Sequence, residues 1–281
     1  MLPLHFVVLL AGIQGLSEAL PVSRSGHDVV AWIWLEPGAN GARLETLLHL
    51  ATAAALLFAA RKRLAHAAGA GLRAIARPAL FRSSEGAHDA AVLLTAFVAS
   101  SIVRALFHHF ALPWKTTPVA IGFGLLLTGL LLATTRLVGP ERNTEITVPL
   151  ALVLGLGHGM GALPGGSDIG AALVLAAWMG TKNDLALDLA LSLSAGTLLV
   201  NCFLTFHEGM ALPDIPAVVL IVGFVTAFLG TTVAIGATRL LLEKRALSLA
   251  AFWIVPLGLA TLAYSRAFSE DLALALFTRP G

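Results

Sequence analysis

Long apolar runs occupy most of the chain, and their lengths predict the fold. Six runs are long enough to cross a bilayer as single helices, at about 44–60, 91–107, 118–138, 186–206, 215–240 and 247–264. A helix satisfies its own backbone hydrogen bonds, which lipid cannot do. The pattern therefore predicts an all-α integral membrane protein with six transmembrane helices.

Two further apolar regions, 3–35 and 148–180, are interrupted in the middle. Each has two apolar arms too short to span, on either side of a polar break: GLSEALPVSRSGH in the first and LGHGMGALPGGSDIG in the second. Proline and glycine at the breaks disfavour a continuous helix. Irregular backbone at membrane depth persists only where protein or trapped water satisfies it. We expect two re-entrant helical hairpins.

The two breaks repeat one plan. Segment 18–21 (Glu-Ala-Leu-Pro) is echoed by 161–164 (Gly-Ala-Leu-Pro), and 23–26 (Ser-Arg-Ser-Gly) by 167–170 (Ser-Asp-Ile-Gly), with one extra residue after the second proline. Each break is followed by three predicted spans. We interpret 1–281 as a single polytopic domain whose halves, about 1–140 and 145–265, repeat each other.

The distribution of basic residues predicts the orientation. Segment 61–82 contains six of them and no acid: Arg61, Lys62, Arg63, Arg73, Arg77 and Arg82. Loops rich in lysine and arginine stay in the cytoplasm, so this segment is predicted to be a cytoplasmic loop. The odd number of spans between the breaks then makes the halves inverted repeats, which place a site near the midplane.

Composition agrees with a lipid environment. Hydrophobic residues make up 57% of the chain and charged residues only 12%, whereas soluble domains are about 25% charged. The net charge is only +2, and no basic stretch is interleaved with aromatics, so no nucleic-acid partner is expected. The single cysteine, Cys202, excludes an intrachain disulfide.

The first break concentrates polar side chains in an apolar context: Gln14, Ser17, Glu18, Ser23, Arg24, Ser25 and His27. A charge at membrane depth costs about 2.5–3.5 kcal/mol on insertion scales unless it is paired. One interpretation is that Glu18 and Arg24 only pair and pin the hairpin. The other is phosphoryl transfer: arginine grips phosphate, serine or histidine attacks, and glutamate holds a proton or a metal ion. Backbone N–H groups at a helix N-terminus would add an anion site.

The segment 14–27 resembles the first signature of bacterial undecaprenyl pyrophosphate phosphatases of the bacitracin-resistance type. That signature reads Glu-Gly-Leu-Thr-Glu-Phe-Leu-Pro-Val-Ser-Ser-Thr-Gly-His, against Gln-Gly-Leu-Ser-Glu-Ala-Leu-Pro-Val-Ser-Arg-Ser-Gly-His here. Segment 163–170 is similar to the second signature, Pro-Gly-Phe-Ser-Arg-Ser-Gly. Length, hairpin positions and the basic loop agree to about residue 264, so the chain resembles a divergent member.

The resemblance implies a fold and a reaction. The fold has six spanning helices and two inverted re-entrant hairpins. The reaction is hydrolysis of undecaprenyl (polyprenyl) diphosphate to the monophosphate, which recycles the carrier lipid of peptidoglycan synthesis. It also implies a divalent cation, Mg²⁺ or Ca²⁺, and a bacterial inner-membrane location with the site facing the periplasm. The lipid is then the expected partner, and a homodimer is compatible with the sequence.

The resemblance also assigns roles by position. Glu18 matches the second glutamate of the acidic pair and is a candidate catalytic residue as well as a candidate metal ligand. Ser23 matches the proposed nucleophile and His27 the essential histidine. The phosphate-binding group comprises Arg24, Ser25, Gly26, Gly166 and Ser167, and the supporting group comprises Gln14, Ser17 and Asp168.

Three departures from the signatures alter the expected chemistry. Gln14 replaces the first glutamate, Asp168 replaces the phosphate-gripping arginine, and Arg24 replaces a serine. We expect Arg24 to supply the missing guanidinium and to pair with Asp168 across the hairpin tips, because two opposite charges in lipid are tolerable as partners. The alternative is that catalysis has been lost and that binding or transport of polyprenyl phosphate remains.

Three residues outside the signatures have open interpretations. Glu45 and His49 are four apart at the start of a span, so they either face the cavity or mark the membrane boundary. His158 lies in the second break and either lines the site or packs with hydrogen-bonded partners.

Overall fold

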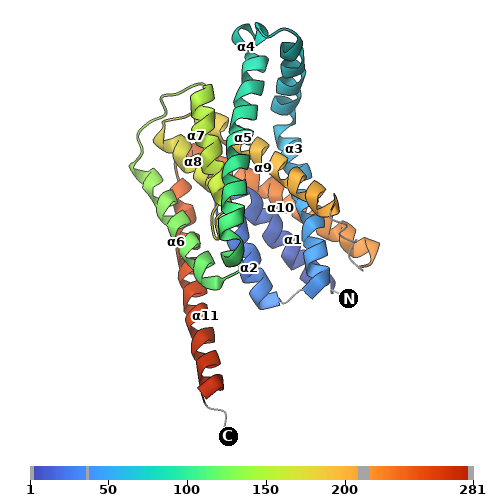
Figure 1. Ribbon diagram of the computed structural model, residues 1–281, viewed down its shortest axis with the longest axis vertical. Helices are drawn as coiled ribbons and strands as arrows, with labels where there is room; N and C mark the ends of the chain where they lie inside the picture. Colours follow the sequence, from blue (N-terminus) through green and yellow to red (C-terminus); the bar gives the residue numbers. More distant parts are fainter. Residues whose placement is uncertain (1–2, 36–37, 208–214, 278–281) are drawn as a thin grey trace.

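The structure is a computed structural model that describes residues 3–35, 38–207 and 215–277. Within these ranges, every secondary-structure element longer than a single bridge is a helix. A single isolated bridge joins Asn143 and Thr181 within these ranges. The helices (Figure 1) are α1 Leu4–Ala19, α2 Arg24–Leu35, α3 Gly38–Ala76, α4 Leu80–Ser83, α5 Glu85–Ala111, α6 Pro118–Thr134, α7 Val148–Gly159, α8 Asp168–Trp178, α9 Asn183–His207, α10 Ala217–Glu243 and α11 Ala251–Phe277.

Six stretches of the described chain are long and apolar enough to cross a membrane, which confirms the six predicted spans. They are Arg43–Ala76, Glu85–Ala111, Pro118–Leu137, Asn183–His207, Ala217–Glu243 and Leu247–Arg266. Large apolar side chains such as Phe123 and Phe252 are exposed on them. Such exposure suits lipid contact. The same charge pattern predicts that 207–214, which has two acids and no lysine or arginine, is an outer loop. This segment lies outside the described residues except for His207.

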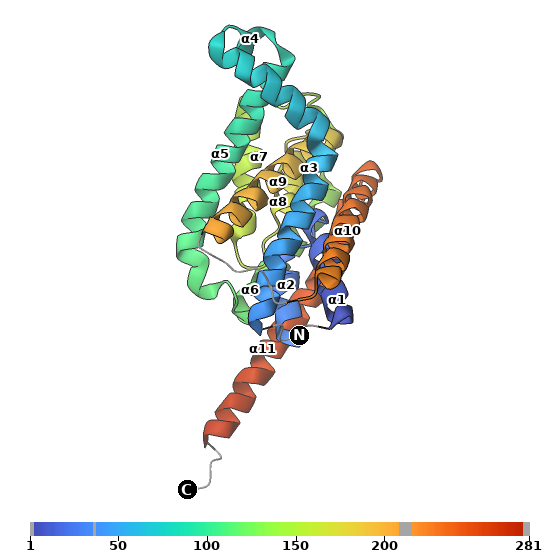
Figure 2. The ribbon, with the colours of Figure 1, turned by 90° about the vertical axis from the view of Figure 1, so that its right-hand side faces the viewer.

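The predicted cytoplasmic loop 61–82 is mostly helical, so that detail was wrong. Helix α3 has 39 residues and continues to Ala76, and α4 follows it. Its alanines, leucines and arginines are strong helix formers. The extension packs on the start of α5 through a small alanine cluster, and Arg63 forms an ion pair with Asp89 there. This helical pair forms one end of the molecule, and the C-terminal part of α11 extends at the other (Figure 2).

Both interrupted regions are pairs of short helices, as predicted. The first pair is α1 and α2; the second is α7, a 3₁₀ turn over Met160–Ala162, and α8. The longest of these helices, α1, has 16 residues, which at about 1.5 Å per residue falls short of a hydrocarbon core of about 30 Å. Pro21 and Pro164 lie in the breaks, where a missing N–H costs least.

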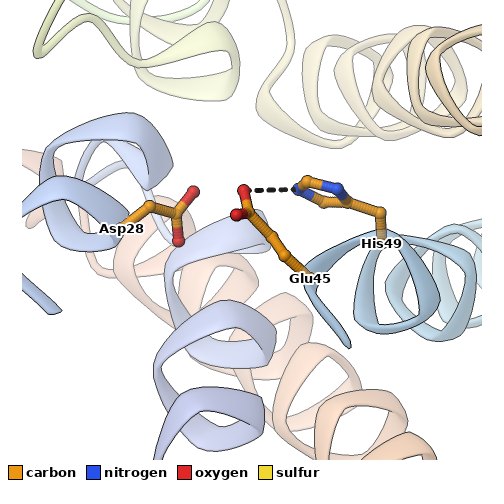
Figure 3. A group of neighbouring side chains, drawn as sticks. All are labelled: Asp28, Glu45 and His49. Atoms are coloured by element: carbon orange, nitrogen blue, oxygen red, sulfur yellow. Dashed lines mark ion pairs between the residues drawn. The ribbon is translucent and has the colours of Figure 1, made fainter. Parts of the chain in front are cut away.

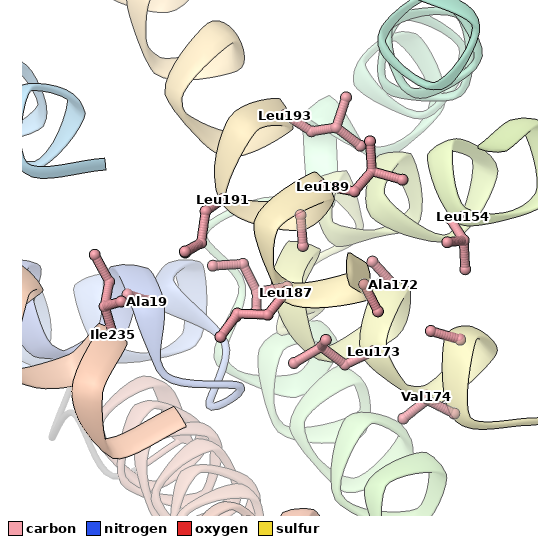
Figure 4. Close-up of a cluster of buried hydrophobic side chains, with 14 of the residues drawn as sticks. Ala19, Leu154, Ala172, Leu173, Val174, Leu187, Leu189, Leu191, Leu193 and Ile235 are labelled. Atoms are coloured by element: carbon pink, nitrogen blue, oxygen red, sulfur yellow. The ribbon is translucent and has the colours of Figure 1, made fainter. Parts of the chain in front are cut away.

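The two breaks are held at the centre of the helical packing. Leucines of α9 (Leu187, Leu189, Leu191 and Leu193) form a buried cluster with α7, α8 and the end of α1 (Figure 4). Helix α1 packs so closely on α10 at Gly15 that a Cβ there would collide with the backbone carbonyl of Ala227. The core thus carries α1 and α8 together, each with its break at one end.

Candidate functional site

The two breaks line one small cavity, so they lie side by side as predicted. The lining residues are Ser17, Glu18, Arg24, Ser25, Gly161, Gly166, Ser167, Asp168 and Ile169. The space of about 10 Å³ has room for about one water molecule. Gly161 is required here, since a Cβ at that position would overlap the Asp168 carboxylate.

Each break ends in a serine that caps the next helix. The Ser167 hydroxyl accepts a hydrogen bond from the Gly170 N–H (3.0 Å), and the Ser23 hydroxyl accepts one from the Gly26 N–H (3.2 Å). Such caps satisfy N–H groups that a helix start leaves free. Ser23 is fully buried and is not among the residues that line the cavity. Its predicted role as nucleophile stays a prediction, and the cap is its observed contact.

Arg24 is the hub of the first break. Its Nε lies 3.1 Å from Glu18 Oε2, and its Nη1 lies 3.2 Å from Asp28 Oδ2. The same Nη1 lies 2.8 Å from the His49 ring. A cation in the first turn of a helix opposes the helix dipole. The carboxylates of Glu18 and Asp28 compensate for this unfavourable interaction with the dipole. The 3.1 Å contact confirms that Glu18 and Arg24 form an ion pair.

The predicted ion pair between Arg24 and Asp168 is wrong. The Asp168 carboxylate is paired instead with Arg104 of α5, whose Nη1 lies 2.7 Å from Asp168 Oδ1. Asp168 is the first residue of α8, where a negative charge is favourable. Sequence reasoning missed Arg104, although it is the only charged residue in the run 91–107. An intramembrane charge is itself a signal for a functional site.

Two buried oxygen atoms at the site have no hydrogen-bond partner among the described residues. The Ser25 hydroxyl is one of them, and Ser25 lines the cavity. The other is Oε1 of Gln14, a side chain only 2% exposed whose Nε2 donates to Glu18 at 3.3 Å. Buried polar atoms are normally paired, so each exception marks a place for a ligand or water. Ser17 also lines the cavity, and its hydroxyl donates a hydrogen bond to the Ile13 carbonyl.

His27 is not among the residues that line the cavity. The Trp253 indole donates to its Nε2 at 2.9 Å, and its Nδ1 lies 2.8 Å from the Ser23 carbonyl oxygen. An indole N–H can only donate, so Nε2 accepts and Nδ1 carries the proton. The Nε2 contact joins α2 to α11, and the Nδ1 contact holds the ring against the start of its own helix. The predicted catalytic role of His27 stays a prediction.

His158 is a packed, hydrogen-bonded residue. It is fully buried, and its two ring nitrogens contact the hydroxyls of Ser100 (2.8 Å) and Ser194 (3.0 Å). Ser100 is four residues before Arg104 on α5, so this network also fixes the helix that carries the partner of Asp168.

Two groups of side chains could hold a divalent cation, and one of them suits it better than the other. Glu18, the predicted metal ligand, is already engaged by Arg24 and Gln14. A second group fits better: Asp28, Glu45 and His49 place one donor atom each within 4.8 Å of one another. Asp28 and His49 approach the Glu45 carboxylate from opposite sides (Figure 3). Of the two open interpretations of Glu45 and His49, the structure supports a position beside the site.

An apolar groove adjoins the polar cavity. It encloses about 180 Å³ between α6 and α8, and most of its lining is apolar, including Leu127, Leu131 and Trp178. Gly166 and Ser167 line both the groove and the cavity. The polar cavity and the apolar groove therefore adjoin each other at the second break.

The family model of the bacitracin resistance protein BacA matches residues 7–260. The chain belongs to this family. An undecaprenyl-diphosphatase of Treponema denticola is 26% identical over 93% of this chain and 97% of its own length. One from Desulfatibacillum aliphaticivorans is 30% identical over 80% of this chain and 85% of its own. One from Rubrobacter xylanophilus is 30% identical over 69% of this chain and 73% of its own.

Membership in the BacA family agrees with the resemblance of the two breaks to the phosphatase signatures. Within that family the three departures sit at the cavity or beside it: Arg24 and Asp168 line it, and Gln14 contacts Glu18. Arg104 stands beside Asp168, so this BacA-family chain has a guanidinium at each break despite the charge reversal.

Proposed function

We propose that this protein is a membrane phosphatase that hydrolyses undecaprenyl (polyprenyl) diphosphate to the monophosphate, and so recycles the carrier lipid of peptidoglycan synthesis. The observation that carries the proposal is the junction at Gly166 and Ser167, which line a polar cavity and an apolar groove at once. That junction suits a molecule with a phosphate head and a hydrocarbon tail. The names of the BacA-family relatives support the same substrate.

In the proposed mechanism, Ser25 takes the role of nucleophile that the resemblance assigns to Ser23, because the Ser23 hydroxyl is buried and caps α2. The buried Ser25 hydroxyl has no hydrogen-bond partner among the described residues, and Ser25 lines the cavity together with Glu18. The Ser25 oxygen attacks the terminal phosphorus while its proton passes to Glu18, and the bond to the bridging oxygen breaks. The lipid monophosphate leaves, and water then hydrolyses the phosphoserine to release inorganic phosphate.

The guanidinium groups of Arg24 and Arg104 bind the phosphate oxygens in this mechanism. Both are paired with carboxylates in the structure, and the cavity holds about one water. Substrate therefore has to widen the cavity and compete with Glu18 and Asp168 for these groups. Arginine suits such an exchange, because its planar fork matches carboxylate and phosphate alike. A bound divalent cation would supply further neutralisation of phosphate charge.

The proposal includes the membrane arrangement. The short helix pairs α1–α2 and α7–α8 act as re-entrant hairpins of an inverted repeat, supported by their matching breaks and by the three spans that follow each one. The protein resides in the bacterial inner membrane with its site open to the periplasmic side. A homodimer remains a prediction, which cross-linking in native membranes would test.

Phosphate release from undecaprenyl diphosphate by the purified protein, with and without a divalent cation, tests the function. We expect release with wild-type protein and roughly a hundredfold less with Ser25→Ala. Glu145→Gln, an exposed change outside the site, should leave the rate unchanged. Binding of the lipid without release would instead support the alternative, a catalytically altered homologue that carries polyprenyl phosphate.

A further inference from the structure

The geometry points to a divalent transition-metal site formed by Asp28, Glu45 and His49, with the Gln14 side-chain oxygen as a fourth donor. Asp28 comes from α2, and Glu45 and His49 lie four apart on one face of α3. One donor atom from each of these three lies within 4.8 Å of the others. Two ligands at about 2.0–2.2 Å from one ion lie at most about 4.4 Å apart, so these side chains would draw slightly closer together on binding an ion.

Gln14 is the independent sign of a ligand. Its side chain is 2% exposed, and its Oε1 has no partner among the described residues. Gln14, Asp28 and Glu45 line one small cavity together. A buried amide oxygen left unpaired beside two carboxylates is unfavourable without a cation or water to receive it.

The local charge also favours a divalent ion. Four carboxylates interact with the Arg24 guanidinium: those of Glu18, Asp28, Glu45 and Asp168. Asp168 has a partner of its own in Arg104, so the other three share Arg24. Lys115, the other cation near Glu45, is exposed, so water screens most of its effect. The cluster therefore contains more acidic than basic groups, and a divalent cation would stabilise the ionised forms of these carboxylates.

The donor set indicates the class of metal. Mg²⁺ and Ca²⁺ prefer oxygen ligands alone, whereas an imidazole nitrogen with carboxylates suits Mn²⁺ or Zn²⁺ better. Trp32 donates a hydrogen bond to Glu45 and so orients that carboxylate. Such a supporting contact is typical of metal ligands.

In the structure, Arg24 contacts two of the proposed metal ligands. Its Nη1 contacts Asp28 and His49 at 3.2 and 2.8 Å. The metal therefore exchanges with the guanidinium: once bound, it releases Arg24 from Asp28 and His49 and leaves it facing Glu18 and the polar cavity. This role for the exchange rests on the proposed phosphatase function, whereas the site itself does not.

Mn²⁺ titration of the full-length protein in detergent, stripped with EDTA and free of lipid substrate, tests the site. Electron paramagnetic resonance of free Mn²⁺ gives the bound fraction. We expect one saturable ion per chain, and at least a tenfold weaker affinity in His49→Gln and Glu45→Gln. Glu145→Gln, a matched change of an exposed carboxylate, should bind as the wild type does. A large excess of Mg²⁺ should not displace the ion.

Arg24→Met gives the sharper result. Removing the competing guanidinium should tighten Mn²⁺ binding about tenfold, and misfolding cannot produce such a gain. No saturable binding in wild type, unchanged affinity in His49→Gln, displacement by Mg²⁺, or weaker binding in Arg24→Met would each overturn the assignment. Because no substrate is present, these results are independent of phosphate release. A protein that binds Mn²⁺ here and releases no phosphate would retain the site and lose the proposed reaction.

Discussion

The two breaks share a backbone plan. Each contains a proline, ends in a serine cap, and is braced by a threonine of a neighbouring helix. The Thr238 hydroxyl of α10 donates to the Ala19 carbonyl (2.8 Å), and the Thr128 hydroxyl of α6 donates to the Gly165 carbonyl (2.9 Å). Thr238 satisfies a carbonyl group at the end of α1, and Thr128 satisfies one in the irregular backbone of the second break. The shared plan is what keeps irregular backbone stable in an apolar protein.

The side chains of the two breaks differ in chemistry. After its cap, the first break presents Arg24 and Ser25, whereas the second presents Asp168 and Ile169. The cation of the first opposes its helix dipole and collects several anions, while the anion of the second is favoured by its dipole and needs one partner. In the proposed mechanism, the first break therefore carries the reactive groups, and the second mainly supports the cavity.

The largest expected effect concerns the ion pair of the second break. Arg104→Met should leave the Asp168 carboxylate uncompensated and lower the free energy of unfolding by about 3 kcal/mol. Arg104→Met with Asp168→Asn should recover most of that loss. Thermal unfolding in detergent, arranged as a double-mutant cycle, measures the coupling. A parallel cycle on Arg24 and Asp168 should give a much smaller coupling, and equal couplings would contradict the observed pairing.

The next effect separates equivalent positions of the two breaks. Ser25→Ala should reduce phosphate release about 100-fold, or about 2.7 kcal/mol of barrier, because the nucleophile is lost. Ile169→Val removes only a buried methylene at the matching position. It should lower stability by about 1 kcal/mol and change the rate by less than roughly tenfold. Steady-state rates and unfolding midpoints on the same preparations decide between them. A larger loss of rate in Ile169→Val than in Ser25→Ala would show that the second break, and not the first, carries the reactive groups.

Backbone conformation offers a smaller contrast. Ser23 has φ 65°, a left-handed value that is strained for serine. In the second break the extra residue, Gly165, takes φ 70°, and Ser167 is extended. Gly165→Ala should therefore destabilise the protein by about 2 kcal/mol, since its Cβ would also collide with the Ile121 carbonyl. Ser23→Gly relieves strain while losing the cap, so its unfolding midpoint should change little.

The smallest effect tests whether the two braces are equivalent. Thr238→Val and Thr128→Val each remove one buried hydrogen bond while keeping the side-chain shape, at a cost of about 1 kcal/mol. Unfolding midpoints of the two variants should agree closely. A loss of activity confined to Thr238→Val would show that the first break needs its brace for function as well as for stability.

Much of the fold follows from sequence because apolar run length is a strong signal. The six spans and both breaks were predicted, since proline and glycine interrupt an otherwise apolar pattern. The helical extension of α3 was missed because the basic residues of segment 61–82 were interpreted as belonging to a loop. Arginine and lysine are in fact good helix formers. Charge pattern predicts orientation and does not predict where a helix ends.

The site was predicted in part. The cluster around Glu18 and Arg24 was found because polar residues close in sequence stay close in space. The partner of Asp168 was not, because Arg104 lies 64 positions away and only the packing of α5 on α7 brings them together. Asp28 was overlooked for another reason: a lone acid next to His27 has meaning only once α3 places Glu45 and His49 against it.

The narrowness of the polar cavity has a consequence for the membrane as an electrical insulator. A protein with polar breaks deep in a bilayer risks conducting ions or protons, and each elementary charge crossing about 100 mV dissipates about 2.3 kcal/mol. A space of about 10 Å³, lined by Arg24, Glu18 and Asp168, has no room for a file of water molecules. In the proposed membrane arrangement, the resting protein therefore keeps these polar groups within the bilayer while preserving the voltage across it.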